Sequence, residues 1–199
     1  TQKLKGYQQV LGNAWSTGAN LNTARKNAGG AGASSSSALA FGGNTGSASA
    51  LTESYNGTSW TEVNDLNLAR GSGGAGGIQT SAIFMGGAVD PPVQNEVETW
   101  NGTNWTEVAD LNTARYDMGG AASVNTNALA FAGYSPGGDS AVTESWNGSS
   151  WTEVADLNDA RQLRGAGTSN TNALAIAGYN NPGGATKSVE AWQGSAWYE

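Results

Sequence analysis

The segment 98–108 constrains the fold of this chain more than any other feature, because it is repeated. Its sequence, Glu-Thr-Trp-Asn-Gly-Thr-Asn-Trp-Thr-Glu-Val, has close copies at 53–63, 144–154 and 190–199, and a degenerate copy at 8–15. The second Trp of each copy falls at positions 15, 60, 105, 151 and 197, in steps of 45, 45, 46 and 46 residues. A fixed period of this length indicates a fold built from repeated supersecondary units.

Each repeat contains four short segments that read as strands. An Arg follows each of the first four Trp residues by ten positions, at 25, 70, 115 and 161. Next come a run of Gly and Ala (28–32, 73–77, 119–122, 165–167) and an apolar run ending in Gly (38–43, 82–87, 128–133, 173–178). We name the predicted strands a (small residues), b (apolar), c (Glu-x-aromatic) and d (Trp-Thr-Glu-Val). Helices are not expected, because no apolar period of 3.6 residues is sustained.

Strands c and d are joined by Asn56-Gly57, Asn101-Gly102, Asn147-Gly148 or Gln193-Gly194. Asn-Gly is the strongest short hairpin signal, since both central residues of a type I′ turn need positive φ. The sequence therefore predicts a c–d hairpin with such a turn in every repeat.

Four strands at a period of 45–46 residues are typical of a β-propeller blade. The chain resembles the kelch-repeat family through the Gly pair that closes strand b, the aromatic residue of strand c, and the Trp five positions later. The Gly pair weakens to Ala132-Gly133 and Ala177-Gly178 in the later repeats. The resemblance implies an all-β propeller of four-stranded antiparallel blades with strand a innermost, where small residues suit a crowded and narrow centre.

We expect a ring of four blades, with five blades as the alternative. We expect one domain over 1–199, with a partial c–d unit in 1–20 and blades at 21–63, 64–108, 109–154 and 155–199. In a four-bladed ring the N-terminal hairpin joins the closing blade. In a five-bladed ring one inner strand pair is missing, and another chain or upstream sequence supplies it. The chain begins at Thr1 rather than Met, which is compatible with a processed product or a piece of a longer protein.

Composition removes several classes of function. There is no His and no Cys, which excludes Ser-His-Asp and Cys-His catalysis as well as thiolate metal sites, so we expect no enzyme, no cofactor and no metal. The copper chemistry of galactose oxidase, a kelch-family enzyme, cannot be carried over for the same reason. A net charge of -7 with only 9 Lys and Arg argues against nucleic acid. No apolar run is long enough to span a membrane, and no signal-peptide pattern is visible.

Two periodic features have both a structural and a functional interpretation. The Arg series pairs by period with Glu53, Glu98, Glu144 and Glu190, which predicts either a ring that binds an anion or, as we favour, one hydrogen-bonded network per blade. The aromatic series predicts packing between blades rather than ligand stacking. Within it, Trp15 and Trp197 are the candidates for exposure, because they lie near the closure.

The b-to-c loop varies most between repeats, and variable loops on a rigid scaffold are where binding usually resides. Our candidate ligand or partner residues are drawn from these loops. They are Asp90, Tyr134, Asp139, Tyr179 and Asn180. The alternative is that the loops are merely solvated connections.

These features together predict a non-catalytic binding or structural module. The units at 56–63 and 110–115 resemble tandem propellers of bacteriophage structural and tail proteins, especially marine ones. That resemblance implies a virion or extracellular location and a partner that is a host-surface glycan or protein, or a neighbouring subunit. The alternatives are a lectin-like carbohydrate-binding propeller of cellular origin, and an architectural array that associates with further copies of itself.

Overall fold

The computed structural model describes residues 18–89 and 92–199, and these residues form an all-β structure without helices. Its main elements are four antiparallel sheets of four strands each. Sheet 1 contains β1 (Gly29–Ser34), β2 (Ser37–Phe41), β3 (Thr52–Tyr55) and β4 (Trp60–Val63). Sheet 2 contains β5 (Gly74–Ile78), β6 (Ser81–Ala88), β7 (Val93–Trp100) and β8 (Trp105–Val108).

The second half of the chain repeats this order. Sheet 3 contains β9 (Gly119–Val124), β10 (Asn127–Phe131), β13 (Thr143–Trp146) and β14 (Trp151–Glu153). A two-stranded hairpin, β11 (Tyr134–Ser135) and β12 (Gly138–Asp139), lies between β10 and β13 in the chain. Sheet 4 contains β15 (Ala166–Ser169), β16 (Asn172–Asn180), β17 (Gly184–Trp192) and β18 (Trp197–Tyr198). Strands a to d thus pair in sequence order in every sheet, as the repeats predicted.

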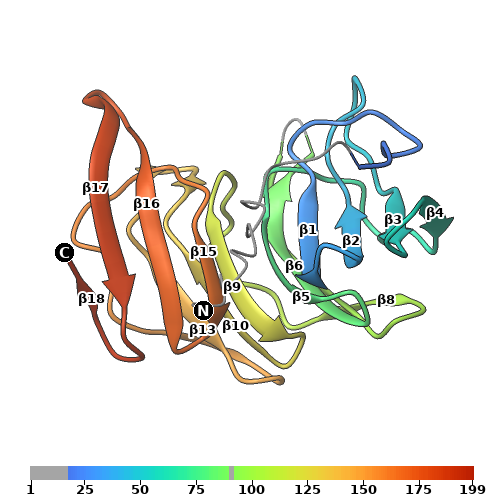
Figure 1. Ribbon diagram of the computed structural model, residues 1–199. Helices are drawn as coiled ribbons and strands as arrows, with labels where there is room; N and C mark the ends of the chain where they lie inside the picture. Colours follow the sequence, from blue (N-terminus) through green and yellow to red (C-terminus); the bar gives the residue numbers. More distant parts are fainter. Residues whose placement is uncertain (1–17, 90–91) are drawn as a thin grey trace, which may run out of the picture.

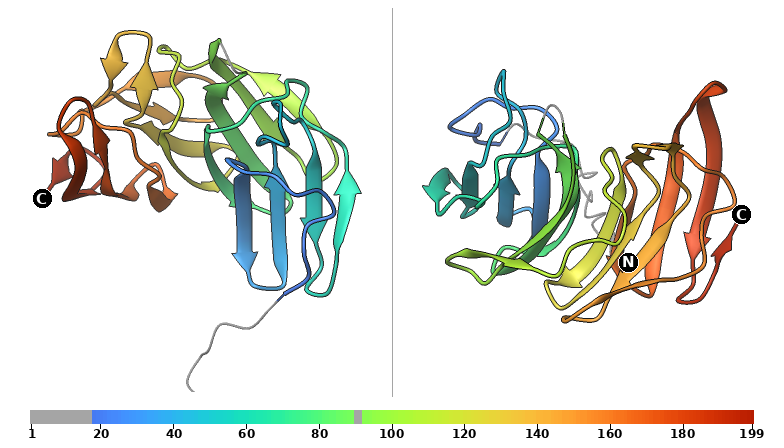
Figure 2. Two further views of the ribbon diagram at one scale, coloured as in Figure 1. Left: turned by 90° about the horizontal axis from the view of Figure 1, so that it is seen from above. Right: turned by 180° about the vertical axis from the view of Figure 1, so that it is seen from behind.

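The four sheets follow one another around a propeller-like arc (Figure 1), with sheet 1 and sheet 4 at its two ends (Figure 2). Neighbouring sheets meet through their first strands, because β5 contacts β1, β9 contacts β5, and β15 contacts β9. Among the described residues, β1 and β15 do not form a comparable pair. The small residues of strand a therefore lie where sheets meet most closely, as expected.

Apolar side chains lock each sheet onto the next. We call the side of a sheet that faces the next sheet in the chain its forward face, and the opposite side its backward face. Phe41 on the forward face of sheet 1 packs edge-on against Phe84 and Trp105 of sheet 2, with ring centroids 5.3 and 4.8 Å apart. The Trp105 Nε1 also donates to Thr52 Oγ1 at 3.0 Å. The prediction that the aromatic series packs one repeat against the next is therefore confirmed as packing between neighbouring sheets.

The c–d connection is a hairpin in every sheet, but the predicted type I′ turn is wrong. Tyr55 pairs with Trp60, so the loop contains four residues, 56–59. Gly57 has φ of 94°, whereas Asn56 does not have positive φ. The Asn56 Oδ1 instead accepts the main-chain N–H groups of Thr58 and Ser59 at 2.9 and 3.0 Å. An Asn side chain that satisfies its own turn removes the need for a second positive φ.

The expectation that Trp197 is exposed is also wrong. Its ring is buried, lies 4.9 Å from the Phe131 ring, and donates from Nε1 to Thr143 Oγ1 at 3.0 Å. Trp197 belongs to the backward face of sheet 4, so sheet 3 covers it although it lies near the end of the chain. Trp15 lies outside the described residues.

Close approach of the first strands predicts an unequal response to the same substitution at equivalent positions. A Cβ on Gly120 of β9 would come within 2.5 Å of the Ala75 nitrogen, whereas one on Gly30 of β1 would meet, among the described residues, only the Leu39 carbonyl at 3.8 Å. We expect Gly120→Ala to destabilise the fold by about 1–3 kcal/mol through overpacking, and Gly30→Ala to change stability by less than about 0.5 kcal/mol. Urea unfolding in dilute solution measures both, and equal effects would contradict the described packing.

Candidate functional site

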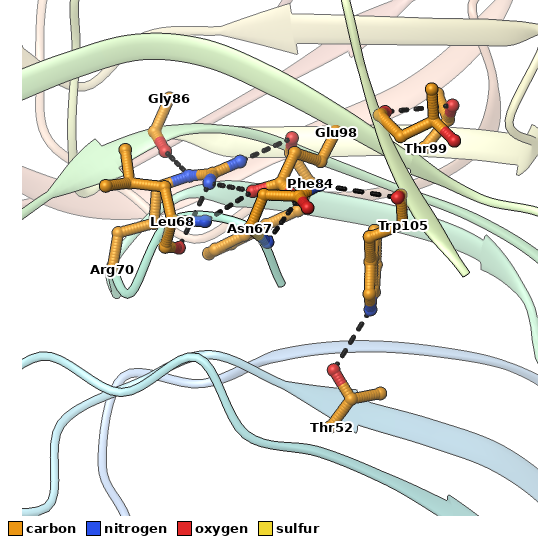
Figure 3. A network of polar contacts seen from close by, with 10 residues as sticks. Thr52, Asn67, Leu68, Arg70, Phe84, Gly86, Glu98, Thr99 and Trp105 are labelled. Atoms are coloured by element: carbon orange, nitrogen blue, oxygen red, sulfur yellow. Dashed lines mark hydrogen bonds and ion pairs between the residues drawn. The ribbon is translucent and has the colours of Figure 1, made fainter. Parts of the chain in front are cut away.

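The periodic Arg and Glu residues form a buried network inside each sheet. In sheet 2, the Arg70 guanidinium binds Glu98 and donates from Nε to the Gly86 carbonyl at 2.9 Å (Figure 3). The other oxygen of Glu98 accepts the main-chain N–H and the amide of Asn67 at 2.7 and 2.8 Å. The same pair recurs as Arg25–Glu53, Arg115–Glu144 and Arg161–Glu190, at 3.1, 2.8 and 2.6 Å.

These four guanidiniums are 0% exposed. Burial lowers the pKa of Arg115, and the facing Glu144 carboxylate opposes that shift. Since the charges are desolvated and paired, they have no surface to offer to an external anion. The favoured network interpretation is confirmed, and the alternative of an anion-binding ring is wrong.

A pocket of about 450 Å³ opens where strands b end and strands a begin, and it spans sheets 1 to 3. The Tyr116 and Tyr134 rings lie together on one side of it, 5.4 Å apart and inclined by 50°. Its other polar lining residues come from the two remaining sheets and from the turn before β9. They are Lys26, Asn27, Asn44, Ser72 and Asp117. The lining therefore combines aromatic faces with amide, hydroxyl and singly charged groups.

Three of these residues hold an unusual backbone conformation. Asn27, Ser72 and Asp117 have φ of 58°, 61° and 47°, which is uncommon for residues other than Gly. The Ser72 N–H donates to the Asn27 carbonyl at 2.9 Å, and the Asp117 N–H donates to the Ser72 carbonyl at 2.7 Å. The Leu163 N–H continues the series to the Asp117 carbonyl at 3.0 Å. This chain of hydrogen bonds between sheets fixes the positions of these three residues in the pocket lining.

The pocket lining carries one charge of each sign, and one further cation contacts it. Lys26 and Asp117 lie in the lining, and the Arg164 Nη2 from sheet 4 reaches Asp117 Oδ1 at 3.2 Å and Asn27 Oδ1 at 3.0 Å. Burial raises the pKa of Tyr116, and the charge of Asp117 adds to that effect. Its phenol is therefore protonated at neutral pH and can donate a hydrogen bond. Such a lining suits an uncharged ligand with several hydroxyl groups.

Of the residues predicted from the loops, Tyr134 lines this pocket. Asp139 pairs with Tyr134 across the β11–β12 hairpin, but its carboxylate is occupied by the Gln162 amide, at 2.9 Å, and by the Asn181 N–H. It therefore ties the hairpin to sheet 4. Tyr179 and Asn180 end β16 and are not part of the pocket lining. Asp90 lies outside the described residues.

Sequence reasoning missed the part of the pocket that follows the periodic Arg. The two positions after it read Lys26-Asn27, Gly71-Ser72, Tyr116-Asp117 and Gln162-Leu163. These dipeptides differ in every repeat although the Arg before them does not change. The available signal was this variation between repeats at the two positions directly after the constant Arg.

Comparison with protein-family models and with curated proteins finds no match. In the described part of the chain, no group of three or more His, Cys, Asp or Glu side chains could hold a metal ion. The described residues also contain no helix with the length and apolar character needed to span a membrane.

The buried network predicts that two Arg residues differ sharply in their contribution to stability. Arg115→Met leaves the Glu144 carboxylate buried without its cation, so we expect a loss of about 3–5 kcal/mol. Arg164→Met removes an ion pair whose Arg side chain is 55% exposed, so we expect a loss below about 1 kcal/mol. Urea unfolding followed by Trp fluorescence measures both, and a small effect of Arg115→Met would be incompatible with the buried pair.

Proposed function

We propose that this chain is a kelch-like propeller that serves as a non-catalytic binding module, and that its pocket takes the hydroxyl-rich end of a glycan. The observation that carries the proposal is the pocket formed by Tyr116, Tyr134 and the turn residues between sheets 1 to 3. Its volume of about 450 Å³ lies in the range of small-ligand sites, roughly 300–1,000 Å³. Two tyrosines beside amide and carboxylate groups offer apolar faces and oriented polar groups together.

The rigidity of the scaffold supports a binding role. The repeated Arg and Glu side chains are paired with each other inside each sheet, and the aromatic series is buried between sheets. Variation between repeats is concentrated at the end of the molecule that carries the pocket. Tyr179 occupies in sheet 4 the position of Tyr134 in sheet 3, because Gln162 bridges to Tyr179 as Tyr116 bridges to Tyr134. Tyr179 and Asn180 are therefore proposed as additional contacts for a ligand longer than the pocket.

We place this module in a virion or outside the cell, where its partner is a host-surface glycan or protein or a neighbouring subunit. The resemblance of the repeats to propellers of bacteriophage structural and tail proteins supports that location. It is a family-level analogy and assigns no residue a role. A lectin-like propeller of cellular origin is the alternative, and it uses the same pocket. We propose four blades closed with the help of 1–20, with five blades as the alternative.

A glycan array, followed by calorimetric titration of the tightest glycan, tests the pocket. We expect Tyr116→Ala and Tyr134→Ala each to weaken binding at least tenfold, which corresponds to about 1.4 kcal/mol. Tyr198→Ala is the matched control, because Tyr198 is an exposed tyrosine on β18 and is not part of the pocket lining. Tyr179→Ala tests the additional contact. Circular dichroism establishes that each variant is folded. An array without signal, or pocket variants that bind like the unmodified chain, would refute the glycan proposal.

A further inference from the structure

One side chain from sheet 4 reaches two acceptor atoms of the pocket lining. Arg164 lies just before β15, and its Nη2 donates to Asn27 Oδ1 at 3.0 Å and to Asp117 Oδ1 at 3.2 Å. Asn27 and Asp117 line the pocket, whereas Arg164 does not. The Arg164 side chain is 55% exposed, and that of Asp117 is 33% exposed. The contact is therefore an exposed ion pair beside the pocket, of a kind that contributes little to stability.

The two acceptors are held in place by main-chain bonds that do not involve the Arg164 side chain. Hydrogen bonds of 2.9 and 2.7 Å link Asn27 to Ser72 and Ser72 to Asp117. The Asp117 carbonyl also accepts the Leu163 N–H at 3.0 Å, and Leu163 is buried in the core between sheets 3 and 4. The main chain next to Arg164 is thus anchored beside Asp117. The guanidinium can consequently turn into solvent while the two acceptor oxygens keep their positions.

The chemistry of these two oxygens defines what can replace Arg164. A carboxylate oxygen and an amide oxygen only accept hydrogen bonds, so the replacing group must donate them. Both oxygens lie within 3.2 Å of one nitrogen atom, which places them close enough together for two hydroxyls on neighbouring carbons of a sugar ring to reach both. The bond to the Asp117 carboxylate is charge-assisted and is therefore stronger than a bond between neutral groups.

We propose that Arg164 competes with the glycan: its guanidinium occupies the place of two neighbouring sugar hydroxyls, and the glycan displaces it when it binds Asn27 and Asp117. This inference rests on the glycan-binding function proposed above, and it assigns that site an affinity-determining residue outside the pocket lining. Arg164 lowers the affinity, because its contacts must break before the new bonds form. Since salt screens an exposed ion pair, a neutral glycan binds the unmodified chain more tightly at higher ionic strength.

Calorimetric titration with the tightest neutral glycan of the array tests the competition. At low salt we expect Arg164→Met to bind about two- to fivefold more tightly than the unmodified chain, the range that exposed ion pairs support. Raising the ionic strength from about 0.02 M to about 0.5 M should tighten binding by the unmodified chain and leave Arg164→Met unchanged. Lys187→Met is the matched control, because it removes an exposed cation of β17 that is not part of the pocket lining. Its affinity should equal that of the unmodified chain at both salt concentrations.

The same glycan separates this inference from the proposed function. If Tyr116→Ala weakens binding but Arg164→Met binds no more tightly than the unmodified chain, the competition is refuted and the pocket stands. Weaker binding by Arg164→Met also refutes the competition, since Arg164 would then contact the glycan itself. If Tyr116→Ala binds like the unmodified chain, or the array gives no signal, both proposals fail. Nitrogen–proton NMR observes the displacement directly: the Arg164 Nε–H signal, identified by its loss in Arg164→Met, should shift when the glycan is added.

Discussion

A buried guanidinium at the junction of two sheets organises each repeat. Arg115 binds Glu144 of its own sheet with its side chain, while its main chain joins the preceding sheet. Its carbonyl accepts the Gly87 N–H at 2.8 Å, and its N–H donates to the Gln94 carbonyl at 3.1 Å. Burying such a cation is costly unless it is paired and hydrogen-bonded. This requirement explains why Glu, and the Asn that donates to it, recur with the Arg in every described repeat.

The same junction explains the Gly that closes strand b. Gly87 has φ of 105°, and a Cβ there would come within 2.6 Å of the Gly71 carbonyl oxygen. The second Gly of the pair is therefore kept in all four repeats. The first position tolerates Ala, since Ala132 and Ala177 adopt φ of 59° and 51°. Ala thus replaces Gly only at the first position of the pair, where a side chain is accommodated.

Features that recur at a fixed spacing could be predicted from the sequence, because their causes lie within one repeat. The four strands, their order in the sheet and the Arg–Glu network all belong to this group. The turn type was missed because Asn56 caps the loop with its side chain, which the Asn-Gly signal does not distinguish from a type I′ turn. The exposure of Trp197 was mispredicted because the covering sheet, not the distance from the chain end, decides burial.

The pocket and the end of the arc arise between sheets, where periodicity carries less information. Nearly identical repeats encode nearly identical interfaces, but the number of sheets that would close a ring depends on the rotation at each interface. Part of the pocket lining depends on hydrogen bonds between Asn27, Ser72 and Asp117 of successive sheets. No local pattern identifies these residues as neighbours. Their variation between repeats becomes interpretable only once the sheets are placed beside one another.

Arg164 limits what the pocket can recognise. Its guanidinium occupies Asn27 Oδ1 and Asp117 Oδ1, so part of the polar capacity of the lining is already satisfied within the protein. A ligand must therefore compete with an exposed and salt-screened contact, or use the groups that remain, the Lys26 ammonium and the Tyr116 and Tyr134 hydroxyls. Arg164 lies just before β15 of sheet 4. A ligand that competes with Arg164 would therefore be sensitive to the position of that sheet. A ligand that instead uses the Lys26, Tyr116 and Tyr134 groups depends only on sheets 1 to 3 and the turns between them.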